Sequence, residues 1–161
     1  MRRTARFALS AVAAAMLALA CGGSSNSQTA STPPPTPTPQ PVLKTAMATV
    51  DGKSQTILVG ENGMTLYYYT PDKGAGKVTC TGQCLTAWPP LLLPSGVDKP
   101  TGESGVTGTL TTLPSPNGGM QVVYNGWPMY YWQKDTKPGD TTGQNVGGKW
   151  FVVPPDVASG M

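Results

Sequence analysis

Apolar and polar residues alternate along two short stretches of the chain, and an Asn-Gly pair precedes each stretch. The pairs are Asn62-Gly63 and Asn125-Gly126. Because Asn-Gly favours the left-handed turn that joins antiparallel strands, each pair is expected to form the turn of a β-hairpin. Pro128 lacks an amide hydrogen, so its strand should pair on one side only at that point. The expected strands are 57–59 and 64–69 in the first hairpin, and 121–124 and 127–132 in the second.

The same alternation assigns the side chains of these strands to two faces. Four aromatic residues share one face, namely Tyr67, Tyr69, Tyr130 and Trp132. We expect them to be core residues that fix the strand register, since a domain of this size needs its aromatic side chains for burial. The alternative is a platform that binds a sugar ring, a quinone or a partner. The opposite face carries Met64, Leu66, Tyr68, Trp127, Met129 and Tyr131.

The two stretches are copies of one short motif, which is Tyr67-x-Tyr69-x-x-Asp72 in the first copy and Tyr130-x-Trp132-x-x-Asp135 in the second. A Trp followed by apolar residues and prolines closes each copy, at positions 88 and 150. A repeat with the same residues at both ends indicates a structural unit that is used twice. We therefore expect two similar β units packed about an approximate two-fold axis, with Trp88 and Trp150 in comparable places near a shared core.

The rest of the folded part favours an all-β chain, because it is rich in Gly, Pro, Thr and Val and shows no long helical periodicity. We predict a small antiparallel β domain, barrel- or sandwich-like, built from two similar hairpin-containing repeats. Its expected limits are 48–157, with repeats at 48–115 and 116–157. Residues 158–161 are expected to be a tail, and the Ser/Thr/Pro-rich segment 21–47 a disordered tether.

The first twenty residues have the pattern of an export signal. Three arginines precede an apolar run, 7–20, that is too short to span a bilayer but suits the central part of a signal peptide. Small residues before Cys21 resemble the cleavage site of bacterial lipoproteins, where the Cys is lipidated and becomes the mature N-terminus. Ala18 stands where that site most commonly has Leu. The alternative is an ordinary signal peptide cut after Ala20, with Cys21 left as a free thiol.

Removal of this signal changes the charge of the protein. The whole chain carries a formal charge of +3, but all three arginines lie in the signal, which leaves eight lysines and eight acidic residues. A neutral domain without arginine is not expected to bind nucleic acid or anionic lipid. We therefore expect membrane attachment through the lipid alone, with the protein exported to the bacterial cell envelope on the periplasmic or the surface side of a membrane.

Cys80 and Cys84 form the most chemically suggestive pair. In an exported protein, two close cysteines indicate first a disulfide. The alternative is a metal site, since this spacing resembles thiolate copper chaperones, but those also use a His and the chain has none. Lack of His also removes the usual general base of an enzyme. We expect no metal, no cofactor and no catalysis.

Asp72 and Asp135 end the two motif copies, and each can accept hydrogen bonds from nearby backbone amides and so hold a turn. That structural role is the one we expect. Paired carboxylates could instead serve acid–base chemistry or bind a cation. Asp135 with Asp140 is a weak calcium candidate, because a calcium loop supplies several closely spaced oxygen ligands.

The motif copies resemble those of bacterial lipoproteins with the Yx(FWY)xxD motif, the secreted repeat of unknown function. The resemblance covers about 56–155. Met129 stands where Leu is usual, and Phe151 where some relatives carry His or Tyr. The resemblance implies an exported, usually lipid-anchored β-rich domain and no established reaction. Blocks that carry it include 63–67, 80–84, 88–91, 124–130, 138–144 and 150–153.

Three functions stay open from the sequence. The first is a non-catalytic envelope lipoprotein that presents a small domain to an unknown envelope protein or small ligand. The second is an envelope redox or metal-handling protein that uses Cys80 and Cys84. The third is a carbohydrate-binding module, which requires Tyr130 and Trp132 to face solvent.

Overall fold

The computed structural model describes residues 41–161 of the chain. The predicted signal peptide, the lipidation site Cys21 and the tether up to residue 40 lie outside the described residues. No helix within 41–161 is long and apolar enough to cross a membrane. The elements are β1 (Leu43–Val50), β2 (Lys53–Gly60), β3 (Tyr67–Tyr69), η1 (Thr70–Asp72), α1 (Gln83–Ala87), β4 (Leu110–Pro114), β5 (Met120–Tyr124), β6 (Trp127–Pro128), η2 (Val146–Gly148) and β7 (Trp150–Val152).

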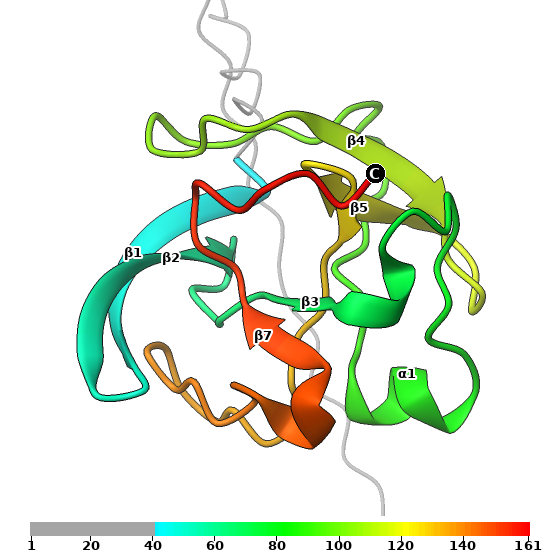
Figure 1. Cartoon of the computed structure of the whole chain (residues 1–161). Coiled ribbons are helices and arrows are strands. Elements are labelled where there is room, and N and C mark those ends of the chain that lie inside the picture. The colour runs from blue at the N-terminus through cyan, green and yellow to red at the C-terminus, as the bar shows by residue number, and fades with distance from the viewer. Residues whose placement is uncertain (1–40) are drawn as a thin grey trace, which may run out of the picture. The chain divides into compact units, whose positions relative to one another are not determined.

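The strands form small antiparallel sheets with the orders β1-β2, β3-β7 and β4-β5-β6. Figure 1 shows β1 and β2 as a long curved hairpin at the left and β4 with β5 at the top. β3 lies near the centre with β7 below it, and α1 lies at the lower right. Isolated bridges join the sheets, and one of them pairs Tyr67 with Tyr130. The predicted all-β class and antiparallel pairing are confirmed, and the sheets are small.

The second predicted hairpin is present, with Val123 opposite Pro128 and Tyr124 opposite Trp127. Its turn residues Asn125 and Gly126 have φ values of 48° and 84°. Positive φ at both positions is the conformation that Asn-Gly favours. β6 lies at the edge of its sheet, as expected for a strand that contains a proline.

The first predicted hairpin has a longer turn than the second. Its strands meet where Val59 pairs with Thr65, and the amide of Gly60 donates to the carbonyl of Met64 at 3.0 Å. Gly63 has a φ of 78°, whereas the Asn62 side chain accepts a hydrogen bond from the Met64 amide at 3.0 Å. The two Asn-Gly pairs therefore make different turns.

The folded part begins before the expected boundary at residue 48, because β1 starts at Leu43 and Val42 and Leu43 are both buried. β1 and β2 form a third hairpin that was not predicted from the sequence, and its turn residues Asp51 and Gly52 have φ values of 50° and 77°. The predicted tether, 21–47, is therefore too long at its C-terminal end.

Residues 158–161, expected to be a tail, pack against the β5–β6 hairpin. The Trp127 indole Nε1 donates to the carbonyl of Ala158 at 2.8 Å, and the Gly160 amide donates to the carbonyl of Asn125 at 2.9 Å. Gly160 is buried, and a Cβ added there would lie 2.6 Å from the Trp127 ring. The packing is thus specific to glycine at this position.

Two hydrophobic clusters form the core, and they correspond to the two predicted strand faces. Leu66, Trp127 and Met129 belong to one cluster, against which Tyr68 and Tyr131 pack. Tyr67 and Tyr130 belong to the other cluster. That second cluster also contains both closing tryptophans, Trp88 and Trp150, with Tyr69 and Trp132 packed against it.

Candidate functional site

The two motif copies meet at Tyr67 and Tyr130. The amide of each residue donates to the carbonyl of the other, at 2.8 and 3.0 Å, and neither side chain is exposed to solvent (0% each). Reciprocal bonds of this kind relate the two strands by a local two-fold axis. The structure therefore has the predicted arrangement of two similar units about an approximate two-fold axis.

Each motif tyrosine binds the aspartate of the other repeat. The Tyr67 hydroxyl donates to Asp135 Oδ2 at 2.6 Å, and the Tyr130 hydroxyl donates to Asp72 Oδ2 at 2.7 Å. Both aspartates are buried, at 2% and 8% exposed. A buried carboxylate is costly unless it is hydrogen-bonded, and these charge-assisted bonds are of the strong kind. The crossed pairs therefore connect the two repeats inside the core.

A threonine seven residues after each aspartate completes the carboxylate's set of partners. Asp72 Oδ1 accepts from the amide and hydroxyl of Thr79, at 2.8 and 2.5 Å. Asp135 Oδ1 accepts from the amide and hydroxyl of Thr142, at 3.0 and 2.6 Å. Both carboxylates accept backbone amide hydrogens, as predicted, although the amides lie seven residues away rather than in an adjacent turn.

The protonation of these groups follows from their burial. Burial and the hydrogen bond to Asp135 raise the pKa of Tyr67 far above its ordinary value of 10.0. Burial and the charge of Asp72 raise the pKa of Tyr130 in the same way. Both phenols therefore stay protonated through the neutral range and act as donors. Outside this cluster, burial, with a smaller effect of the Glu61 charge, raises the pKa of Tyr131 to about 12.

Four aromatic rings beside the crossed pairs form one continuous stack. Its order is Tyr69, Trp150, Trp88 and Trp132, with ring centroids separated by 4.2, 3.8 and 4.1 Å along that order. The two inner rings are nearly parallel, at 3°. Each outer ring lies on the closing tryptophan of the other repeat. Trp88 and Trp150 thus occupy comparable places in the shared core, as predicted.

The crossed tyrosines touch the two inner rings of this stack edge to face. Tyr67 lies 5.4 Å from Trp88 at an interplanar angle of 74°, and Tyr130 lies 5.1 Å from Trp150 at 88°. These are the distances and angles that aromatic pairs prefer. The contacts therefore follow the same two-fold relation as the Tyr–Asp pairs.

The aromatic face is mainly core rather than a binding platform. Tyr67 and Tyr130 are fully buried, and Tyr69 and Trp132 are partly buried at the ends of the stack. One face of Trp132 lies on Trp88, and Lys134 Nζ lies 5.6 Å from the same ring's centroid. Two of the four residues are therefore core residues, and each of the other two has one ring face covered by a tryptophan.

Cys80 and Cys84 are joined by a disulfide, as predicted, with Cα atoms 5.4 Å apart. The bond links the segment before α1 to the helix itself, and Cys80 is buried. Within 41–161, no group of three or more His, Cys, Asp or Glu side chains could hold a metal ion. Asp140, the weak calcium candidate with Asp135, instead accepts hydrogen bonds from Thr136 and Lys137.

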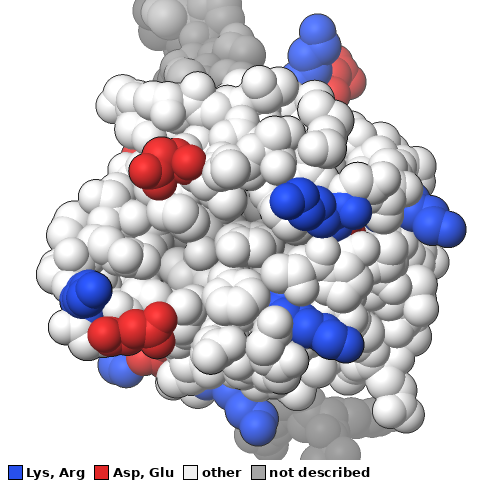
Figure 2. Space-filling model, in the orientation of Figure 1, with Lys and Arg blue, Asp and Glu red and all other residues white. Residues whose placement is uncertain are grey.

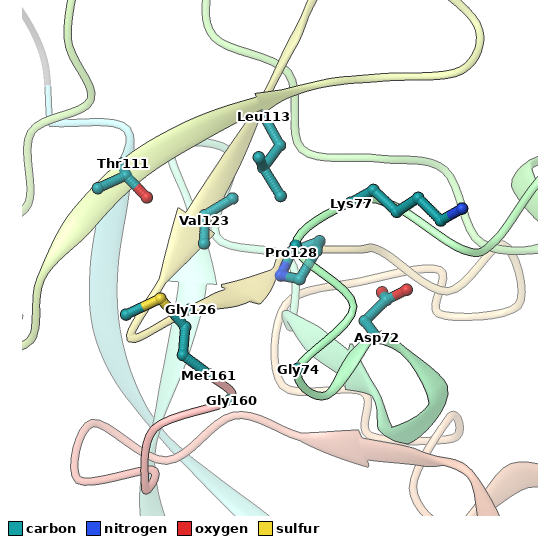
Figure 3. Close-up of a pocket in the computed structure, with 11 residues that line it drawn as sticks. Asp72, Gly74, Lys77, Thr111, Leu113, Val123, Gly126, Pro128, Gly160 and Met161 are labelled. Carbon is teal, nitrogen blue, oxygen red and sulfur yellow. The ribbon is translucent and has the colours of Figure 1, made fainter.

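A cavity of about 300 Å³ lies beside Asp72. Figure 3 shows Thr111, Leu113, Val123 and Pro128 from β4, β5 and β6 on one side, with Asp72, Gly74 and the C-terminal residues on the other. Its lining is mostly apolar, with Asp72, Lys77 and Thr111 as the polar side chains. Apolar pockets with a few polar groups are the usual form of small-molecule sites. This cavity was not predicted from the sequence, because Gly160 and Met161, which line it, were expected to belong to a tail.

Charged side chains are scattered over the face of the molecule in Figure 2. Lys and Arg do not gather there into a large patch of one sign, and uncharged residues cover most of that face. The face shown in Figure 2 therefore does not favour ligands of one charge over the other.

Sequence reasoning found the residues of the site but not their pairing. Nothing in the motif distinguishes a tyrosine that binds its own aspartate from one that binds the aspartate of the other copy. The sequence carries one signal of this arrangement, because Thr79 and Thr142 both stand seven residues after a motif Asp.

These features define a duplicated all-β domain whose two repeats share a core and exchange Tyr–Asp hydrogen bonds. Residues 48–92 and 111–154 match the family described as secreted repeat of unknown function, so the chain belongs to this family and the suspected resemblance is confirmed. Each matched segment contains one motif copy and its closing tryptophan. Membership indicates an exported protein. Comparison with curated proteins and with solved structures found no match.

Proposed function

We propose that the protein is a non-catalytic, lipid-anchored protein of the bacterial envelope whose folded domain binds a small, largely apolar molecule with one polar group. The observation that carries this proposal is the cavity of about 300 Å³ beside Asp72. Its volume lies at the lower end of the range for small-molecule sites. The non-catalytic part rests on the two motif carboxylates, since each already accepts three hydrogen bonds.

The chemistry of the lining limits the ligand. Leu113, Val123 and Pro128 offer apolar contacts, while Asp72 and Lys77 offer charges of opposite sign. A ligand with one polar end is therefore oriented by whichever charge faces it. Benzyl alcohol, benzylamine and benzoate have similar shapes and differ in charge. Their relative affinities therefore show whether Asp72 or Lys77 determines which ligand charge is preferred.

Ligand-observed NMR with these three probes tests the binding proposal. Thr111 is exposed at the cavity, so Thr111→Trp should fill its mouth without disturbing the core, and binding of the preferred probe should be lost. Ser54→Trp is the matched control, because Ser54 is exposed on β2 and does not line the cavity, and it should bind as the wild type does. Equal binding by both variants, or no binding of any probe by the wild type, contradicts the proposal.

Anchoring is tested separately through Cys21. If Cys21 carries the lipid, Cys21→Ser should move the protein from the membrane fraction to the soluble fraction and remove the lipid from its mass. Ser24→Ala, three residues further on, is the control and should stay in the membrane fraction. A Cys21→Ser protein that remains membrane-bound at unchanged mass contradicts lipid anchoring.

A further inference from the structure

The crossed pairs and the aromatic stack together form an arrangement of which only Asp72 lines the ligand cavity. Tyr67 and Tyr130 are fully buried, each donates to a carboxylate, and each touches an inner tryptophan of the stack. Buried hydroxyls need only a hydrogen-bond acceptor, which a backbone carbonyl can supply, as Pro155 does for Tyr124 at 2.6 Å. The motif tyrosines instead have an ionisable partner.

The stack connects these buried groups to the surface. Trp88 and Trp150 are buried, with 4% and 5% exposed, whereas Tyr69 and Trp132 at the two ends are partly exposed. Neighbouring rings are separated by 3.8–4.2 Å between centroids, so their π systems are in direct contact. A small reagent that reaches either end is therefore in electronic contact with both tyrosines through one or two tryptophans.

We propose that the domain reacts with one-electron oxidants and stores the oxidation as a buried tyrosyl radical. The stack loses an electron at a partly exposed end. The resulting electron vacancy then moves to Tyr67 or Tyr130, which becomes a neutral tyrosyl radical. Trp and Tyr are among the side chains that lose one electron most easily. An oxidised phenol is a strong acid, so it forms readily only where a base can take its proton. The carboxylate oxygens at 2.6 and 2.7 Å are within direct proton-transfer distance.

The charges around the stack favour movement of the vacancy inward. Lys134 Nζ lies 5.6 Å from the Trp132 ring, and a positive charge there destabilises a tryptophan radical cation. Asp135 and Asp72 accept the hydroxyl hydrogens of the two tyrosines that touch the inner rings, and their negative charges stabilise positive charge on those tyrosines in a core of low polarity. The vacancy therefore moves from the outer ring toward the tyrosines.

The step balances in electrons and protons. An oxidant of the one-electron class, such as a small inorganic radical, takes one electron from Trp132 and leaves a tryptophan radical cation. Tyr67 then supplies one electron through Trp88 and passes its hydroxyl proton to Asp135, which becomes neutral. The tyrosyl radical returns to tyrosine when a one-electron reductant supplies an electron and Asp135 returns the proton. Tyr130 can supply the electron to Trp132 in the same way through Trp150 and Trp88, and it then passes its hydroxyl proton to Asp72.

Pulse radiolysis with the azide radical, which oxidises tryptophan, tests this on the purified mature protein. In the wild type, the tryptophan radical signal should convert into a tyrosyl radical signal at a rate independent of protein concentration, and EPR of rapidly frozen samples should show the tyrosyl radical. A tryptophan radical that decays without forming a tyrosyl radical, or only at a rate proportional to protein concentration, overturns the proposal. This measurement needs no variant.

Variants then assign the site. Tyr67→Phe/Tyr130→Phe should lose the concentration-independent phase. Tyr68→Phe/Tyr131→Phe should keep it, because these residues pack in the other cluster and no hydrogen bond from their hydroxyls to a carboxylate is present within 41–161. Asp72→Asn/Asp135→Asn retains both phenols but removes the bases, so the tryptophan radical should persist longer and the solvent deuterium isotope effect should change. An unchanged phase in the Tyr67→Phe/Tyr130→Phe protein overturns the assignment, and the single variants replace any double variant that does not fold.

Discussion

Tyr67 and Tyr130 combine burial with a polar hydroxyl, and a buried hydroxyl must be hydrogen-bonded. The partner is an aspartate in both cases, and the aspartate is in turn satisfied by a threonine seven residues further on. Because the pairs cross between the repeats, the Tyr and the Asp of one motif copy belong to two different hydrogen-bonded pairs.

High pH should destabilise the fold through these phenols. The unfolded tyrosine has a pKa of 10.0, and the folded values of Tyr67 and Tyr130 are raised. The stabilising contribution is therefore complete below pH 10 and is lost as the pH rises above it. Each such phenol should lower the free energy of unfolding by about 1.4 kcal/mol per pH unit above 10.

Denaturant unfolding of the wild type and of Tyr67→Phe at several alkaline pH values measures this loss. The free energy of unfolding of Tyr67→Phe should fall less steeply with pH than that of the wild type, because the variant lacks one of the two buried phenols. Tyr130→Phe should behave in the same way. Equal slopes in the wild type and both variants would mean that these tyrosines ionise at their ordinary pKa in the folded protein.

Between each motif aspartate and its closing tryptophan, the two repeats use different short elements. The first repeat has α1, which the Cys80–Cys84 disulfide connects to the preceding segment. The second has the 3₁₀ turn η2, and Gln144, just before this turn, accepts from the Val152 amide at 2.9 Å and donates to Asp51 at 2.8 Å. The covalent link in one repeat is thus matched by side-chain hydrogen bonds in the other.

Removal of the disulfide should destabilise the protein without changing its fold. In the chain-entropy account, closing so small a loop contributes about 2 kcal/mol, so Cys80→Ala/Cys84→Ala should lose about that amount in denaturant unfolding. The crossed Tyr–Asp pairs do not depend on this bond, and the near-ultraviolet circular dichroism of the aromatic stack should persist. Loss of that spectrum would mean that the disulfide is needed to form the core.

The sequence predicted elements best where turn chemistry and alternation agree. Asn125-Gly126 gave the correct hairpin because both residues adopt positive φ, which few other pairs tolerate. The β1–β2 hairpin was missed although Asp51-Gly52 is the same kind of signal, because β1 adjoins the polar tether and its alternation is weak. Local patterns predicted the two faces, but the strands expected at 64–69 and 127–132 are shorter in the structure, at Tyr67–Tyr69 and Trp127–Pro128. The sheet to which each strand belongs could not be predicted, since β3 pairs with β7.

At the scale of the whole domain, duplication explains why the site lies where it does. The local two-fold axis passes between Tyr67 and Tyr130, so each Tyr–Asp pair and each stacked pair occurs twice. The duplicated motif was visible in the sequence, and it predicted the shared core and the placement of Trp88 and Trp150. It could not predict that the pairs cross between repeats, because that depends on how two hairpins pack across the axis.

The crossed Tyr–Asp hydrogen bonds also couple the stability of one repeat to that of the other. If the buried hydrogen bonds of each repeat are completed by the other, neither repeat can satisfy its own carboxylate alone. An unsatisfied buried polar group costs about 1–3 kcal/mol, and more when it is charged. We therefore expect the two repeats to unfold as one cooperative unit.

The most direct test of the crossed arrangement is a pair of double-mutant cycles measured by denaturant unfolding. The first combines Tyr67→Phe with Asp135→Ala, and the second combines Tyr67→Phe with Asp72→Ala. The crossed pair should show a coupling energy of about 1.5–3 kcal/mol, whereas the pair within one motif should be additive to within about 0.5 kcal/mol. Strong coupling between Tyr67 and Asp72 with none between Tyr67 and Asp135 would contradict the account.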